Sequence, residues 1–123
     1  MELIIAPRAR RDIASILAWT QENFGPQTLK RYAKLIQTAI MEVAANPELP
    51  GSAQRPEIAT HCRTYHLIHS RNKAGGRGNK VRKPRHVLLY RVGESGVVEI
   101  GRVLHDSMEL EQHLPEEYRR PAE

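Results

Sequence analysis

The chain has 123 residues, of which 40% are hydrophobic, and it carries 19 Lys and Arg against 14 Asp and Glu for a net charge of +5. This length suits one domain with a modest core, and the hydrophobic content excludes a globally disordered chain. A single cysteine excludes an intrachain disulfide framework, and no segment reaches the ~20 apolar residues of a membrane span. We therefore expect a cytoplasmic protein with no membrane partner.

The first part of the chain predicts a strand and then two helices. Residues 2–6 (ELIIA) form a short apolar run that is typical of a strand. Residues 8–24 carry apolar side chains at helical spacing on one face, and residues 26–45 repeat this pattern. The Gly25-Pro26 connection is so short that the two helices should pack as an antiparallel hairpin, with the glycine in a left-handed conformation.

The second part predicts strands that are separated by loops. Residues 46–60 contain three prolines and a glycine, which favours a loop. The later segments are assigned from their β-forming residues and turn signals: strands at 62–69, 86–92 and 97–104, a hairpin turn at 93–96, a short helical or irregular segment at 106–114, and a polar tail at 115–123.

The order of these elements predicts an α+β fold. It consists of an N-terminal strand, a helical hairpin and a three-strand antiparallel segment, with the helices packed on one face of the sheet. We expect one domain over residues 1–114, with a basic insertion at residues 70–85 and the tail outside it.

The excess of positive charge is confined to residues 70–85. The other 107 residues hold 12 basic and 14 acidic side chains, a net charge of −2. Because like charges repel, this stretch is either a flexible arm that meets phosphates or an acidic protein surface, or a solvated insertion that keeps the protein soluble. Its basic residues are the candidates for contact with a target or nucleic acid: Arg71, Lys73, Arg77, Lys80, Arg82, Lys83 and Arg85.

Three residues of the predicted strands are candidates for chemistry. Arg63 and Arg91 either aim a planar guanidinium at phosphate or carboxylate, or lie at the surface in ion pairs, for example with Glu94 or Glu99. His105 ends a strand, where it either transfers a proton or holds the backbone.

Three aromatic residues of the predicted elements also have two interpretations each. Tyr65 and Tyr90 either stack on bases or fill half-buried positions in the sheet. Trp19 lies off the main apolar stripe of its helix, so it either packs internally or belongs to an interface with another chain. No histidine pair has zinc-binding spacing and no nucleotide-binding loop is present, so we expect neither a metal nor a cofactor.

The order and spacing of several short motifs resemble the ParE/RelE superfamily of toxins from bacterial type II toxin–antitoxin systems. The resemblance covers nearly the whole chain and is closer to the ParE branch than to the RelE branch. The matching residues are Ala9-x-x-Asp12-Ile13-x-x-Ile16, Phe24-Gly25-Pro26, Tyr32-x-x-Leu35-Ile36, Asn46-Pro47, Gly51, Arg63, His86-x-Leu-Leu-Tyr90-Arg91, Arg102-Val103-Leu104-His105, Met108 and His113-Leu114.

This resemblance implies a small toxin that is neutralised by a cognate antitoxin. ParE-like members act on DNA gyrase and block replication, whereas RelE-like members, the alternative, cut messenger RNA on the ribosome. In that alternative Arg63 and Arg91 would hold the phosphate and His105 would transfer a proton. No carboxylate or lysine matches a second catalyst, which favours a gyrase inhibitor without catalysis over an endoribonuclease.

The basic insertion is where this chain departs from the family. ParE-like chains join the second and third strands by a short turn, and here residues 70–85 intervene. The insertion would reach gyrase-bound DNA, ribosomal RNA or an acidic antitoxin segment. A non-catalytic nucleic-acid-binding domain is therefore a third hypothesis.

Overall fold

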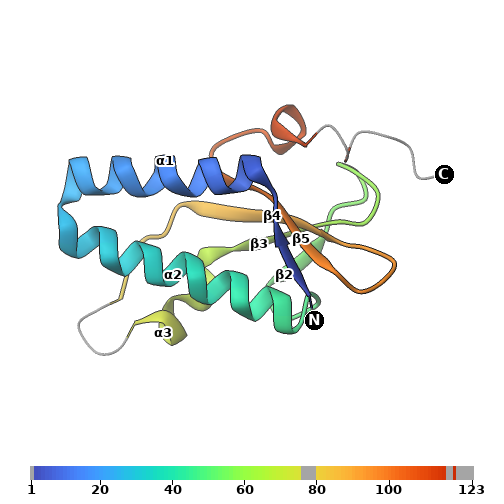
Figure 1. Cartoon of the computed structure of the whole chain (residues 1–123), viewed down its shortest axis with the longest axis horizontal. Helices are drawn as coiled ribbons and strands as arrows, with labels where there is room; N and C mark the ends of the chain where they lie inside the picture. Colours follow the sequence, from blue (N-terminus) through green and yellow to red (C-terminus); the bar gives the residue numbers. More distant parts are fainter. Residues whose placement is uncertain (1, 76–79, 116–117, 119–123) are drawn as a thin grey trace.

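The fold is a five-stranded sheet with a helical hairpin on one face, in a computed structural model that describes residues 2–75, 80–115 and 118 (Figure 1). The sheet order is β1-β5-β4-β3-β2, in which β1 runs parallel to β5 and all other neighbours are antiparallel. The predicted α+β class is confirmed. The main elements are β1 (Leu3–Ile5), α1 (Pro7–Phe24), α2 (Pro26–Ala45), β2 (Ser52–Gln54), β3 (Cys62–His66), β4 (His86–Val92) and β5 (Val98–His105).

Gly25 is the single residue between α1 and α2, and it serves both helices. Its N–H donates to Gln21 O at the end of α1, and its carbonyl accepts from Leu29 N in the first turn of α2. The positive φ of 88° is the one expected for glycine, but ψ is 175°, so the backbone is extended rather than left-handed helical. This sharp reversal lets the two helices lie side by side in opposite directions (Figure 1).

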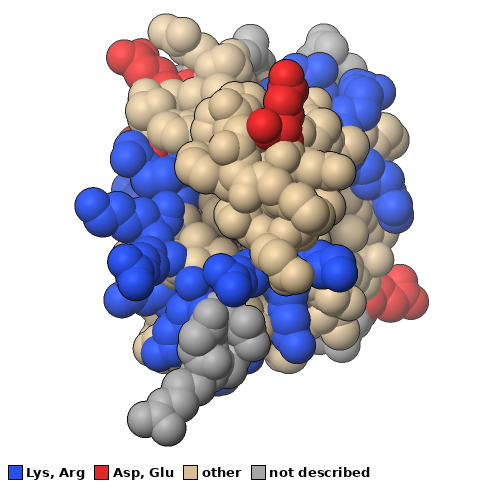
Figure 2. All heavy atoms as spheres, turned by 90° about the vertical axis from the view of Figure 1, so that its left-hand side faces the viewer, with Lys and Arg blue, Asp and Glu red and all other residues tan. Residues whose placement is uncertain are grey.

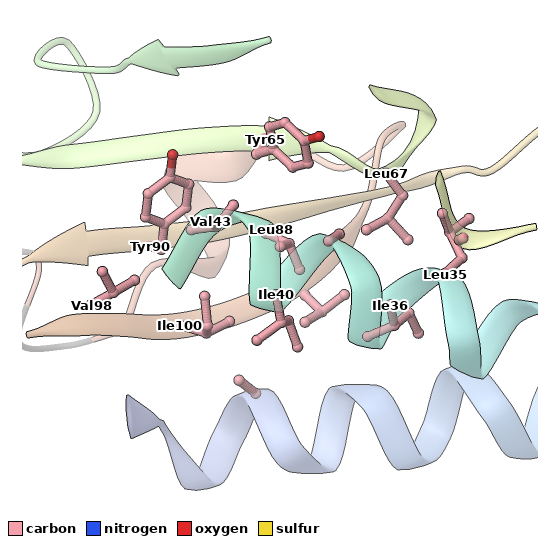
Figure 3. Close-up of a cluster of buried hydrophobic side chains, with 14 of the residues drawn as sticks. Leu35, Ile36, Ile40, Val43, Tyr65, Leu67, Leu88, Tyr90, Val98 and Ile100 are labelled. Atoms are coloured by element: carbon pink, nitrogen blue, oxygen red, sulfur yellow. The ribbon is translucent and has the colours of Figure 1, made fainter. Parts of the chain in front are cut away.

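The main core lies between the helical hairpin and the sheet. Leu35, Ile36, Ile40 and Val43 of α2 point toward side chains of β4 and β5 such as Leu88 (Figure 3). Tyr65 and Tyr90 belong to this core and are 2% and 0% exposed, so they are unavailable for stacking on bases. The apolar face of α2 and the apolar side chains on one face of the strands therefore pack against each other in one interface.

The structure corrects two of the predicted boundaries. The segment predicted as a loop at 46–60 contains the edge strand β2, which pairs antiparallel with β3. The strand predicted over 62–69 ends at His66, and a 3₁₀ helix, η1 (Leu67–Ser70), follows it. The cause is local, since the Nδ1 atom of His66 accepts a hydrogen bond from Ile68 N and turns the chain out of the sheet.

The basic insertion is also more ordered than predicted where the structure describes it. Residues Arg71–Ala74 form one helical turn, α3, and both Ser70 and Ala74 are buried. Glu42 of α2 accepts hydrogen bonds from the Ser70 hydroxyl at 2.6 Å and from Lys73 at 2.9 Å. Arg77 lies outside the described residues.

A smaller cluster includes residues of β3 and β4 and a residue near the C-terminus. Cys62, Leu89 and Ala59 pack there with Tyr118, which is 4% exposed. Burial raises the pKa of the Cys62 thiol to about 11, so the cysteine is an unreactive packing residue. Gly101 leaves room for this contact, because a Cβ atom there would lie 2.6 Å from Tyr118 Oη.

A candidate partner-binding groove

A groove of about 520 Å³ opens between the helical hairpin and the start of β4. One wall comes from α1 and α2, and the other comes from the end of the basic insertion and from the strand ends. Its lining residues are Ser15, Ile16, Trp19, Thr20, Phe24, Thr28, Tyr32, Val81, Lys83, Arg85, His86 and His105. The groove thus combines an apolar wall with cationic and imidazole groups.

The apolar wall carries two large aromatic side chains that face solvent. Trp19 is 58% exposed and Phe24, the last residue of α1, is 62% exposed. Their rings meet edge to face with centroids 5.6 Å apart. Exposed aromatic pairs of this kind are typical anchors for a protein partner.

The floor of the groove is built from Tyr32 and His86. The Tyr32 hydroxyl accepts a hydrogen bond from Arg85 N at 3.1 Å, which leaves its own proton for the Nδ1 atom of His86, 2.5 Å away. Burial raises the pKa of Tyr32 to about 12, and burial lowers the pKa of His86 to about 4. Both groups are therefore neutral near pH 7.

His105 lies against His86, with the two ring centroids 5.4 Å apart. Its Nδ1 atom contacts Ser107 Oγ at 2.7 Å and accepts from Ser107 N at 3.1 Å. A backbone N–H can only donate, so Nδ1 is an acceptor and the neutral ring carries its proton on Nε2. His105 therefore caps the turn after β5 and also lines the groove.

Asp106, directly after β5, links Arg85 of the groove wall to His66 at the end of β3. It accepts hydrogen bonds from the Arg85 guanidinium at 3.0 to 3.2 Å and from His66 Nε2 at 3.0 Å. The Arg85 contact, followed by that of His66, lowers the pKa of the Asp106 carboxyl to about 2. This ion pair holds the last residue of the basic insertion beside the groove.

The remaining charges of the basic insertion divide into held and free groups. Lys73 pairs with Glu42, and the Arg71 guanidinium donates to Arg82 O at 2.7 Å. Lys83 lies on the wall of the groove. Figure 2 shows the end of the molecule that carries the α1–α2 turn, where Lys and Arg side chains frame a largely uncharged central area.

Arg63 and Arg91 lie away from this groove and from each other. Arg91 is five residues beyond His86 on β4, which corresponds to about 16 Å along the strand. Arg63 pairs with Tyr90 in the register, so its side chain lies on the face opposite to that of Arg91. Arg91 forms an ion pair with Glu99 at 3.1 Å and covers the Tyr118 ring. The structure therefore does not bring the three candidate residues together.

The sequence analysis did not identify Tyr32, His86 or Asp106 as parts of a site. Tyr32 and His86 are 54 residues apart, and only the packing of α2 against β4 makes them neighbours. Within the described residues, no group of three or more His, Cys, Asp or Glu side chains is placed to hold a metal ion. No helix of that part of the chain is both long and apolar enough to cross a membrane.

Comparisons with known proteins agree on one family. Residues 3–110 match the family model described as ParE toxin of type II toxin-antitoxin system, parDE. Toxin ParE1 of Caulobacter vibrioides is 32% identical over 110 residues, which is 89% of this chain and 94% of that protein. Toxin ParE1 of Mycobacterium tuberculosis is 26% identical over 111 residues, which is 90% of this chain and 95% of that protein.

A solved structure has the same fold. A chain in the chromosomal ParDE TA system from P. aeruginosa superposes with a TM-score of 0.55 at 18% identity, covering 85% of this chain and 95% of that one. Because the family model spans residues 3–110 and a relative that covers most of the chain is 32% identical to it, the chain belongs to the ParE toxin family of type II toxin–antitoxin systems.

Proposed function

We propose that this toxin is held inactive by a cognate antitoxin in the cytoplasm and that, once released, it inhibits DNA gyrase and thereby blocks replication. Membership of the ParE family supports this proposal, as does the likeness to a chain of a ParDE system. The observation that carries the antitoxin part is the groove with its exposed Trp19 and Phe24.

The groove suits a helix or an extended segment of the antitoxin. Its aromatic wall would bury apolar side chains of the antitoxin, and Lys83 and Arg85 on the other wall favour acidic ones. Arg85 is already paired with Asp106, so Lys83 is the cation of this wall that would meet the partner.

The spacing of the arginines supports inhibition rather than catalysis. A ribonuclease needs its phosphate-binding cations and its proton-transfer group around one reacting phosphate. Arg91 and His105 lie at opposite ends of β4 and β5, and Arg91 is already paired with Glu99. A gyrase inhibitor acts through a binding surface and needs no such cluster.

The antitoxin part is tested by co-expression with the neighbouring open reading frame. The tagged toxin should retain the product of that frame in a pull-down, and the Trp19→Ala, Phe24→Ala double variant should retain less of it. The matched control is Met41→Ala, which removes an exposed apolar side chain of α2 outside the groove. No co-purification with the unaltered toxin would contradict the proposal.

The gyrase part is tested with the purified toxin and purified gyrase. The toxin should inhibit negative supercoiling of a relaxed plasmid, and addition of the antitoxin should restore the activity. Primer extension on messenger RNA after induction is the opposing measurement. New cleavage sites in translated messages, with plasmid supercoiling intact, would favour the endoribonuclease instead.

The basic insertion would add a contact with nucleic acid or with an acidic surface near the target. Lys80, Arg82 and Lys83 are exposed and have no carboxylate partner among the described residues. Binding to DNA that falls steeply with salt, and that is lost when these three residues are changed to Gln, would support this contact. Binding that survives the substitutions would exclude it.

A further inference from the structure

A second hollow lies at the opposite end of the sheet from the groove, where β3 begins and β4 ends. It encloses about 510 Å³. Pro47, Pro56 and Val92 supply apolar walls. The polar side chains of the lining are those of Asn46, Glu48, Gln54, His61 and Arg63. Nothing in the proposed toxin mechanism uses this hollow, so its chemistry can be considered independently of the groove.

Arg63 is held in this hollow by a chain of hydrogen bonds that begins in the core. The Tyr90 hydroxyl donates to Pro47 O at 2.6 Å and also contacts Ser52 Oγ. Ser52 Oγ in turn accepts from Arg63 Nε at 2.9 Å. Because Tyr90 is fully buried, this chain fixes the stem of the guanidinium in one position.

The outer end of the Arg63 guanidinium has no partner among the described residues. Two other strand arginines are neutralised, since Arg91 pairs with Glu99 and Arg102 pairs with Asp12. Arg63 is partly buried and forms no ion pair with a carboxylate of the described residues. A partly buried guanidinium that is fixed at Nε and open at both Nη atoms is arranged to bind an anion in two-point fashion.

We propose that this hollow binds a carboxylate of a protein segment, through the Nη atoms of Arg63. The charge of the lining selects a carboxylate over a phosphate chain. Arg63 is the single Lys or Arg among the described lining residues, and Glu48 stands at the same hollow. One cation balances one monoanionic group, and the acid beside it disfavours the higher charge of a phosphate chain, whereas nucleic acid binding draws on many cations. The proline and valine walls fit the carbon chain of an acidic side chain.

The proposal is tested by NMR titration of the ¹⁵N-labelled full chain with sodium acetate, with sodium chloride at equal ionic strength as reference. Acetate should produce saturable shifts of the Arg63 Nε–H and of the backbone amides of Gln54 and Val92. Arg63→Gln should weaken acetate binding at least about tenfold, which corresponds to one charge-assisted hydrogen bond. Arg63→Lys keeps the charge but loses the two-point fork, so it should weaken binding to an intermediate degree.

Arg55→Gln is the matched control. Arg55 donates from Nε to Thr64 Oγ1 at 3.0 Å, much as Arg63 does to Ser52, but it does not line the hollow. Acetate shifts that are equal to those from chloride, that survive Arg63→Gln, or that vanish in Arg55→Gln would overturn the proposal. Tighter binding of inorganic phosphate than of acetate would overturn the assignment to a carboxylate. These outcomes leave the antitoxin and gyrase proposals untouched.

Discussion

Asp12 of α1 and Arg102 of β5 form a two-point ion pair across 90 residues of sequence, with Arg102 Nε at 2.7 Å and Nη2 at 3.0 Å from the carboxylate. The same carboxylate accepts a hydrogen bond from Val103 N. Strand β1 pairs with β5 only as far as Ile100, so Asp12 covers the edge of β5 where β1 has ended. The Asp12 side chain thereby accepts a backbone hydrogen bond from β5 at a position that β1 does not reach.

We predict that Asp12→Ala lowers the free energy of unfolding by about 3 kcal/mol, because it leaves the Arg102 charge buried without its carboxylate. Arg102 is only 8% exposed, so water cannot replace the lost partner. Urea denaturation at pH 7 measures the change. Arg8→Ala is the control, since Arg8 is exposed and approaches Asp12 only to 3.9 Å, and it should cost less than about 0.5 kcal/mol. Equal losses in the two variants would contradict the assignment.

The buried His86 predicts a loss of stability at mildly acidic pH. Its pKa is lowered to about 4 in the folded protein, chiefly by burial, from a reference value of 6.5. The unfolded chain therefore binds the proton first, and stability falls as the pH drops from about 6.5 toward 4. The loss between pH 7 and pH 5 should be roughly 2 kcal/mol.

The pH effect is checked by urea denaturation of the unaltered chain and of His86→Gln at both pH values. The variant should show a clearly smaller difference between pH 7 and pH 5. Asp106 contributes little in this range, because its pKa of about 2 in the folded protein and its ordinary value of 3.8 both lie below pH 5, so the carboxyl is ionised in both states. His61→Gln, at an exposed histidine, should keep the full pH dependence. An unchanged pH dependence in His86→Gln would exclude His86 as the source.

Trp19 and Phe24 should contribute to antitoxin binding and little to folding. Both side chains are mostly exposed, so each alanine variant should unfold at nearly the same urea concentration as the unaltered chain. Truncation of an interface anchor costs about 1 kcal/mol or more, so each variant should weaken antitoxin affinity roughly five- to tenfold. Calorimetric titration with the purified antitoxin measures this. Affinities equal to that of Met41→Ala would place the antitoxin elsewhere.

Substitution of two glycines with positive φ should distinguish the cost of backbone strain from the cost of steric overlap. Gly25 has φ of 88°, and apart from the adjacent residues no atom lies within 4 Å of the position that a Cβ would take, so Gly25→Ala should cost about 2 kcal/mol from strain alone. Gly51 has φ of 97°, and a Cβ there would lie 2.7 Å from Cγ of His69. Gly51→Ala should therefore cost clearly more, as measured by urea denaturation. The double variant Gly51→Ala, His69→Ala should be more stable than the single variant Gly51→Ala. If it is not, the overlap with His69 is not the cause of the lost stability.

Local patterns in the sequence were enough to predict the hairpin and most of the sheet. The stripes of α1 and α2, the Gly25-Pro26 break and the alternation along β4 and β5 are determined by nearby residues. β2 was missed because a strand of three residues between prolines has almost no pattern of its own, and its pairing with β3 creates it. The early end of β3 was missed because it depends on the His66 side chain contact with Ile68 N.

The charge of residues 70–85 also has one part that the sequence determines and another that depends on the tertiary structure. The sequence by itself determined that the chain is a slightly acidic domain with a strongly basic insertion, because formal charge depends only on composition. Only the tertiary structure decided which of these charges are free. Glu42 and Asp106 neutralise Lys73 and Arg85, because the packing of α2 and the end of β5 carries these carboxylates to the two ends of the insertion. Likewise, the sequence alone predicted Arg63, Arg91 and His105 as candidates for one site. The strand register places the two arginines on opposite faces of the sheet and puts Arg91 and His105 at opposite ends of their strands, so the three residues do not share one site.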